Sequence, residues 1–147
     1  MPTFKLTLAY DGTNYAGWQS QANQPTLQDA LEAVLQRILG ESIRTVASGR
    51  TDAGVHALGQ VVGFQSSTQL PADVMLRAIR AYLPADIVAV ALERAPEDFH
   101  AIRDAVRKRY RYVVADGGLP SPFERSYAWR HPTRLDAEAM ARAARCG

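Results

Sequence analysis

Residues 48–57, with the sequence Ser-Gly-Arg-Thr-Asp-Ala-Gly-Val-His-Ala, hold the side chains best suited to chemistry. Their two glycines permit backbone conformations closed to other residues, so we expect a tight loop. Arg50 lies two positions from Asp52, where a cation can orient the carboxylate and keep it ionised. An oriented, ionised carboxylate can act as a nucleophile or a base. We therefore predict that Asp52 is the catalytic residue.

The three histidines suggest a substrate contact but no metal site. His56 lies four residues beyond Asp52, close enough to reach the same substrate. His56, His100 and His131 are widely spaced and have no Cys or acidic partner at a ligand interval. A Ser-His-Asp triad assembled from distant residues stays open, but no Gly-x-Ser-x-Gly elbow supports it. We expect no metal site.

A basic and aromatic stretch at residues 108–114 indicates a second kind of site. As a strand it would place Tyr110 and Tyr112 on one face and Arg109 and Arg111 on the other. Aromatic rings stack on unpaired bases and guanidinium groups contact phosphates, which favours a single-stranded or flipped-out RNA base as ligand. The alternative is a half-buried strand with tyrosines in the core and arginines in solvent.

Asp11 raises a different possibility. A hydrophobic strand ending in Asp-x-Asp-Gly-Thr is typical of phosphatases that form an aspartyl phosphate. Here Ala9 replaces the first aspartate, which would be the nucleophile. A turn at Asp11-Gly12 after the strand is therefore the better interpretation.

The elements that must position the loop follow from hydrophobic periodicity. Thr26 and Gly40 are the expected caps of an amphipathic helix. The expected elements are a strand at residues 4–10, a helix at 26–39, strands at 43–47 and 59–65, a helix that begins at 71 and is stopped by Leu83-Pro84, and a strand at 87–92 covered on both faces. This order predicts an α+β fold with a ferredoxin-like, split β-α-β core.

The remainder of the chain is expected to add three features. These are an Arg-rich strand at residues 107–115, a Gly/Pro loop at 116–122, and a helix from Asp136 whose Ala and Met positions face a core. The sequence stops at Gly147 in or just past that helix, so we expect a partial chain.

Composition limits the class of protein. The 147 residues, 47% hydrophobic and 22% charged, are typical of one globular domain. Neither a membrane-spanning run nor a signal-peptide pattern is present, so a cytoplasmic location is expected. Lys and Arg number 7 against 10 Asp and Glu in residues 1–99, but 10 against 5 in residues 100–147. The basic end is where a polyanion would bind, although a solvated basic face is the alternative.

Five sequence blocks, taken in order, resemble one family. They are residues 10–19 (Tyr-Asp-Gly-Thr-x-Tyr-x-Gly-Trp-Gln), the Gly-Arg-Thr-Asp loop at 49–57 with Gly-Gln-Val at 59–61, Leu-Pro-x-Asp-Ile at 83–87, Phe-His-Ala at 99–101, and Arg-Tyr-Arg-Tyr at 109–112. Their order and spacing are similar to those of the tRNA pseudouridine synthase A family.

The resemblance implies an enzyme that isomerises uridine to pseudouridine in the anticodon arm of tRNA, at positions thirty-eight to forty. It implies a homodimer that needs no cofactor or metal. The catalytic aspartate falls on Asp52, Arg50 pairs with it and holds the flipped nucleotide, and Tyr110 stacks on the target base. Further substrate contacts would come from His56, Arg103, Arg109 and Arg111.

The sequence departs from the family pattern at three points, one of which is Arg80-Ala81-Tyr82 before Leu83-Pro84, where an asparagine is common. Ile102 stands where the family usually has arginine after Phe-His-Ala, with Arg103 next to it. The family's second domain is absent, so residues 1–147 correspond to the N-terminal catalytic-aspartate domain. Because half of the active site would then be missing, the alternative hypothesis is a non-catalytic RNA-binding or assembly module.

Overall fold

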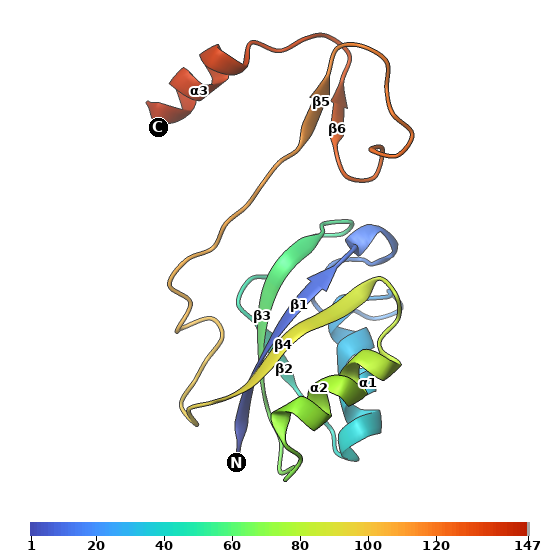
Figure 1. Ribbon diagram of the computed structural model, residues 1–147, viewed down its shortest axis with the longest axis vertical. Helices are drawn as coiled ribbons and strands as arrows, with labels where there is room; N and C mark the ends of the chain where they lie inside the picture. Colours follow the sequence, from blue (N-terminus) through green and yellow to red (C-terminus); the bar gives the residue numbers. More distant parts are fainter. Residues whose placement is uncertain (147) are drawn as a thin grey trace. The chain divides into compact units, whose positions relative to one another are not determined.

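The computed structural model describes residues 1–146, which form two units that are each described by themselves (Figure 1). The first unit is Met1–Lys108 and the second begins at Arg109. The first contains β1 (Thr3–Tyr10), a 3-10 turn η1 (Gly12–Asn14), α1 (Leu27–Leu39), β2 (Thr45–Ala47), β3 (Ala57–Gln65), α2 (Ala72–Tyr82) and β4 (Ile87–Ala95). The second contains β5 (Val114–Asp116), β6 (Trp129–His131) and α3 (Ala137–Arg145).

The first unit is an antiparallel sheet with two helices on one face (Figure 1). The strand order is β2-β3-β1-β4, so the first strand of the chain is central and pairs with β3 and β4. Alternate side chains of β1 are buried, from Phe4 to Tyr10, because a strand directs every second residue to the same face. The prediction of a mixed α and β fold is confirmed.

The expected helix boundaries are confirmed by their caps. The Thr26 hydroxyl accepts a hydrogen bond from the Asp29 amide at 3.3 Å, and Gly40 ends α1 with φ +70°. The apolar stripe of α1 lies against the sheet, with Leu31 and Leu35 fully buried. The sequence predicts α1 well because its capping residues and its apolar stripe indicate the same helix.

The expectation that the last strand of this unit is covered on both faces is wrong. Val88 and Val90 of β4 are 52% and 46% exposed. The helices cover one face only, and β4 is the edge of the sheet. The Arg80 side chain from α2 donates to the carbonyls of Ala89 (2.8 Å) and Val90 (3.0 Å), which occupies two acceptors of that strand.

The segment after β4 returns across the face opposite the helices. Phe99 packs over Gly63 of β3, where a Cβ would lie 3.3 Å from the ring. Ala101 is buried, and its carbonyl accepts a hydrogen bond from the Ser48 hydroxyl at 2.7 Å. The Phe-His-Ala block is thereby joined to the beginning of the loop that holds Asp52.

The predicted Arg-rich strand at residues 107–115 is wrong except at its end. Only Val114–Asp116 is a strand, paired in parallel with Trp129–His131. A strand requires a second backbone to exchange hydrogen bonds, and β6 offers just three residues. Alternation in the sequence describes side chains and does not supply that partner.

The final helix begins where expected but does not face a core. Asp136 caps α3 by accepting from the Ala139 amide at 2.9 Å. None of the described residues of α3 is buried, and Met140 is 53% exposed. The two short strands of this unit provide too little surface to cover a helix.

Helix lengths bear on membrane insertion. The helices have 13, 11 and 9 residues, whereas crossing a bilayer takes about 20 apolar residues. Within residues 1–146, no helix is long and apolar enough to span a membrane.

A matched pair of leucine truncations tests the core. Leu31 is fully buried and Leu58 is 80% exposed. We expect Leu31→Ala to lower the free energy of unfolding by about 2–5 kcal/mol because it leaves a cavity under the sheet. Leu58→Ala should change it by about 0.5 kcal/mol or less. Urea unfolding followed by circular dichroism measures both, and equal losses would contradict this core assignment.

Candidate active site

The loop that holds Asp52 connects β2 to β3. The Ser48 amide donates to the Val61 carbonyl at 2.8 Å, which extends the pairing of the two strands by one step. At the other end, the Val55 amide donates to the Asp52 carbonyl at 3.1 Å and closes a turn. Gly54 has φ +79°, a value that a turn of this kind favours in glycine. The predicted tight, glycine-dependent loop is present.

A second loop, residues 11–18, contacts this loop backbone to backbone. The Trp18 amide donates to the Thr51 carbonyl at 3.0 Å, and the Gly54 amide donates to the Tyr15 carbonyl at 3.2 Å. Each bond satisfies groups that leave regular secondary structure and would otherwise require water. The first and second sequence blocks of the family resemblance are therefore in direct contact.

Two glycines make the close approach possible. A Cβ on Gly12 would lie 2.0 Å from the Val55 carbonyl oxygen, far inside any allowed contact. A Cβ on Gly17 would lie 2.7 Å from the Thr51 oxygen, and Gly17 also has φ +94°, which disfavours other residues. The loops cannot dock in this way with a side chain at either position.

Thr51 is held on both sides while its neighbours face solvent. Its hydroxyl oxygen lies 2.8 Å from that of Tyr10, and its carbonyl accepts from Trp18. Arg50 and Asp52 are exposed. Within residues 1–146 they form no ion pair with each other. Their predicted pairing stays a prediction, and both groups are accessible to a ligand.

His56 contacts the neighbouring loop. Its Nδ1 accepts from the Gly12 amide at 2.9 Å and lies 3.2 Å from the Asp11 carboxylate. One nitrogen cannot accept from the amide and donate to the carboxylate at the same time, and the shorter distance favours the amide. Asp11 also accepts from the Thr13 amide at 3.0 Å, so the turn interpretation of Asp11 is confirmed.

Tyr15 joins the docked loop to the turn before β4. Its hydroxyl donates to the Asp86 carboxylate at 2.8 Å, and the Asp86 carbonyl accepts from the Asp11 amide at 2.9 Å. Burial, followed by the hydrogen bond to Asp86 and its negative charge, raises the pKa of Tyr15 to about 12. The third sequence block, residues 83–87, is therefore part of the same assembly.

The segment containing His100 and Arg103 forms a compact turn. His100 Nδ1 accepts from the Ile102 and Arg103 amides at 3.2 and 3.3 Å. The Asp104 carboxylate accepts from the His100 amide at 2.7 Å and pairs with the Arg103 guanidinium at 3.3 Å. The hydrogen bond from the His100 amide is the largest cause that lowers the pKa of the Asp104 carboxyl group, and the hydrogen bond from the Arg103 guanidinium is the next. Arg103, a candidate substrate contact, is exposed here.

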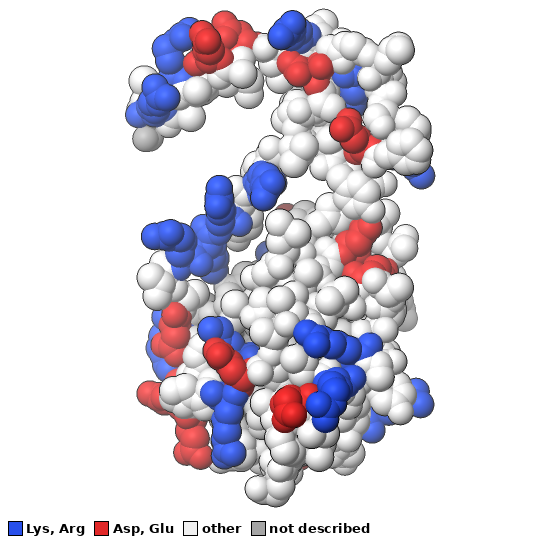
Figure 2. All heavy atoms as spheres, in the orientation of Figure 1, with Lys and Arg blue, Asp and Glu red and all other residues white. Residues whose placement is uncertain are grey.

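The remaining candidate residues belong to the second unit. Arg109, Tyr110 and Arg111 lie outside any strand, and Tyr110 is 67% exposed. Basic side chains gather along the segment between β4 and β5 (Figure 2). These residues are available for a ligand, although the expected separation into an aromatic and a basic strand face is not formed.

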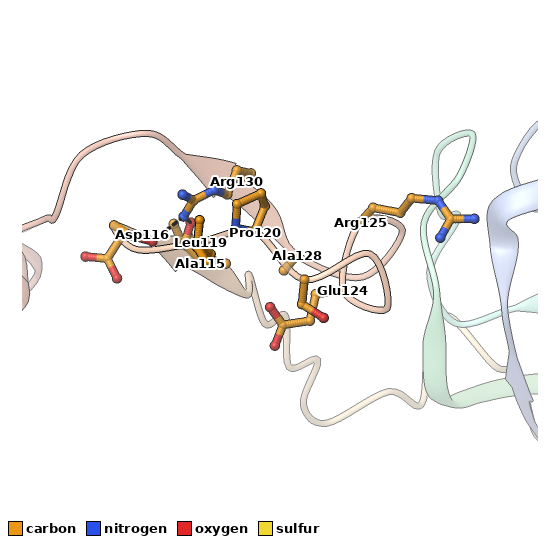
Figure 3. Close-up of a pocket in the computed structure, with 11 residues that line it drawn as sticks. Ala115, Asp116, Leu119, Pro120, Glu124, Arg125, Ala128 and Arg130 are labelled. Atoms are coloured by element: carbon orange, nitrogen blue, oxygen red, sulfur yellow. Dashed lines mark hydrogen bonds between the residues drawn. The ribbon is translucent and has the colours of Figure 1, made fainter.

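A cavity of about 310 Å³ lies in the second unit and contains none of the candidate residues (Figure 3). The Arg130 guanidinium on its wall donates to the carbonyls of Ala115, Gly117 and Gly118. Arg125 extends away from the other lining residues (Figure 3). The bonds of Arg130 order the loop after β5, which makes this a structural cavity.

A metal ion in a protein is bound by a group of ligand side chains. In residues 1–146 no three His, Cys, Asp or Glu side chains come together in a group that could hold an ion. The phosphatase interpretation also loses its support, because Asp11 is used to cap the 3-10 turn.

The comparison with known proteins assigns the class. Residues 7–103 match the family model described as tRNA pseudouridine synthase, so the chain belongs to the tRNA pseudouridine synthase family. That span contains the second half of β1, both docked loops and the Phe-His-Ala segment.

Individual relatives narrow the similarity to one kind of synthase. The chain is 52% identical to tRNA pseudouridine synthase A of Moorella thermoacetica over 98% of its own length and 59% of that protein's. It is 44% identical to the proteins of the same name from Pelobacter propionicus and Lacticaseibacillus casei, covering 98% and 95% of this chain and 59% and 57% of theirs. The chain thus spans about three-fifths of the length of these relatives.

Several residues of the site carry no catalytic signal in the sequence. Tyr10, Gln60 and Trp18 are buried, yet all three make hydrogen bonds to the loop that holds Asp52. Tyr10 was expected as a strand residue and as the first residue of a family block, with no role in the site. A buried amide inside an otherwise apolar strand, as at Gln60, is the one available signal, because a buried polar group needs a partner.

A pair of glycine substitutions tests the docking of the two loops. We expect Gly12→Ala to lower the free energy of unfolding by about 1–3 kcal/mol, because the new methyl group collides with a backbone carbonyl. Gly59→Ala is the control, since its Cβ would have no neighbour within 4 Å. Urea unfolding gives the energies, and amide chemical shifts of residues 51–56 should move only in Gly12→Ala. Unchanged shifts there would contradict the docking.

The pKa of Tyr15 is testable by alkaline titration. Tyrosine ordinarily ionises near pH 10, so the tyrosinate absorbance lost in Tyr15→Phe should be a step near pH 12. Because the raised pKa favours the protonated folded state, its stabilising effect is complete below pH 10 and is lost as pH rises toward 12. Asp86→Asn should move the step down, since the charge is removed. A difference step near pH 10, with native circular dichroism, would contradict the contact.

Proposed function

We propose that this chain carries the catalytic loop of a tRNA pseudouridine synthase, in which Asp52 initiates the isomerisation of uridine. The observation that carries the proposal is an exposed aspartate on a backbone-docked, glycine-dependent loop in a chain of this family. The relatives of 44–52% identity bear the name tRNA pseudouridine synthase A, which supports tRNA as the substrate class.

The reaction explains why a carboxylate is sufficient. The bond between C1′ and N1 breaks, the uracil turns, C5 bonds to C1′, and the C5 proton leaves while N1 gains a proton. Atoms and electrons balance, so the isomerisation is redox-neutral. Asp52 can begin it as a nucleophile at C1′ or C6, or as a base at C2′.

Access to the target uridine requires that the base leave its stack, which costs a few kcal/mol. In this proposal Arg50 orients Asp52 and holds the flipped nucleotide. Tyr110 stacks on the uracil, and its exposed ring supports that role. His56 also contacts the RNA. The phosphates of the RNA are contacted by three arginines, Arg103, Arg109 and Arg111.

The finer assignments belong to the same proposal. The anticodon arm as target and the homodimer follow from the family resemblance, and the cytoplasmic location expected from the sequence is proposed with them. The strand order β2-β3-β1-β4 with its two helical crossovers supports a ferredoxin-like core. As the N-terminal catalytic-aspartate domain, these residues would act together with the part of the relatives' length that this chain does not span.

A non-catalytic RNA-binding or assembly module is the second candidate. The exposed basic and aromatic segment is the observation that motivates it. It leaves the docking of the Asp52 loop unexplained, since binding phosphates requires no ordered, accessible carboxylate. The isomerase is therefore the function that the geometry supports best.

Substitution of one aspartate tests the proposal in the complete protein. We expect Asp52→Asn to abolish proton release from C5 of tRNA uridine while tRNA affinity changes less than about threefold, because the amide keeps the shape but loses the charge. Asp73→Asn, on the exposed side of α2, should keep full turnover. Tritium release from labelled tRNA and filter binding are the measurements.

The outcomes separate the two candidates. Appreciable turnover by Asp52→Asn would remove Asp52 from its role. Salt-dependent binding of tRNA by the wild-type protein, with no pseudouridine formed, would favour the binding module.

A further inference from the structure

We propose that Tyr10 and Gln60 are positioning residues, which fix the Arg50–Asp52 segment through a buried hydrogen-bond chain under the loop. The inference rests on the proposed function, since its consequence is the rate of the Asp52 reaction. Both side chains are more than nine-tenths buried, at 4% and 8% exposed. They come from β1 and β3 at the end of the sheet nearest the loop.

Gln60 replaces a strand partner at the point where β2 has ended. Its side-chain oxygen accepts from the Gly49 amide at 3.4 Å, and its side-chain nitrogen donates to the Gly49 carbonyl. These two contacts allow only one orientation of the carboxamide, because the carbonyl must face a donor and the amide an acceptor. The Gln60 side chain thereby fixes the backbone of Gly49, the residue before Arg50.

Tyr10 extends the chain to the residue between Arg50 and Asp52. The Gln60 side-chain nitrogen also donates to the Tyr10 hydroxyl, 3.3 Å away, and the Tyr10 and Thr51 hydroxyl oxygens lie 2.8 Å apart and share a hydrogen bond. Burial raises the pKa of Tyr10, so its hydroxyl stays protonated. The three side chains thus form one continuous series of hydrogen bonds.

The series of hydrogen bonds acts on Asp52 through the backbone of the loop. The Thr51 hydroxyl contacts Tyr10 of the sheet, whereas its neighbours Arg50 and Asp52 are exposed to solvent. The hydrogen bonds from Tyr10 and Gln60 therefore fix the position and orientation of the Asp52 carboxylate. A displacement of about 1 Å at a reacting group can cost a hundredfold in rate.

A purely structural role for Tyr10 makes a different prediction. Its ring packs 6.3 Å from the ring of Trp18 and fills the end of the core. Tyr10→Phe keeps this packing and removes only the hydroxyl, so the two roles can be separated. Thr51→Val and Gln60→Met likewise remove hydrogen bonding with little change in volume.

The test compares kcat, KM and thermal stability in the complete protein. We expect Tyr10→Phe, Thr51→Val and Gln60→Met to lower kcat by about tenfold to a hundredfold, with KM and tRNA affinity within about twofold. Thr51→Ser should restore kcat. Because Tyr10 and Thr51 share one hydrogen bond, the double variant Tyr10→Phe/Thr51→Val should lose no more than the worse single variant.

Two controls show whether lost stability explains the result. Ile79→Val trims a fully buried residue of α2, remote in sequence from the loop, and should lower the melting temperature with kcat unchanged. Tyr82→Phe removes the hydroxyl of a half-exposed tyrosine and should change neither quantity.

Asp52→Asn in the same assay tests the proposed function separately. If Asp52→Asn is inactive and Tyr10→Phe retains the kcat of Ile79→Val, the positioning inference is overturned while the function stands. If Asp52→Asn turns over normally, the proposed function fails, and the inference fails with it. Loss of kcat in Tyr10→Phe without loss in Ile79→Val supports the inference.

Discussion

Asp52 has a defined position because two loops, residues 11–18 and residues 48–56, contact each other through their backbones. Ordering the backbone of one residue costs about 1–2 kcal/mol, and a polar loop has little apolar surface with which to offset that cost. Docking supplies hydrogen-bond partners for its amides and carbonyls instead. The close approach depends on Gly12 and Gly17, so the position of Asp52 depends on two residues that have no side chain.

The core and the candidate site share residues at one end of the sheet. The Trp18 side chain is 1% exposed and packs in the core, while its backbone amide binds the carbonyl of Thr51. Tyr10 likewise fills the core with its ring and reaches the loop with its hydroxyl. Packing therefore fixes the loop directly, and a residue that looks purely structural by burial contributes to the geometry around Asp52.

Most of the first unit could be predicted because its signals are local. Thr26 and Gly40 bound α1 through contacts within a few residues, and periodicity identified the strands. The exposure of Val88 was missed because an apolar run does not tell whether a strand is central or at an edge. The roles of Tyr10 and Gln60 were missed because their partners lie 11 to 50 residues away in sequence. The expected basic strand failed for a related reason, since alternation cannot supply a neighbouring backbone.

The central place of β1 has a consequence for synthesis of the protein. Residues 3–10 leave the ribosome before both of their partner strands, residues 57–65 and 87–95. At about 5–20 residues per second, the apolar face of the nascent strand waits on the order of ten seconds for its second neighbour. The loop holding Asp52 emerges during that interval, before β3 exists to receive it. The loop therefore gains its full set of contacts only when the sheet closes around β1.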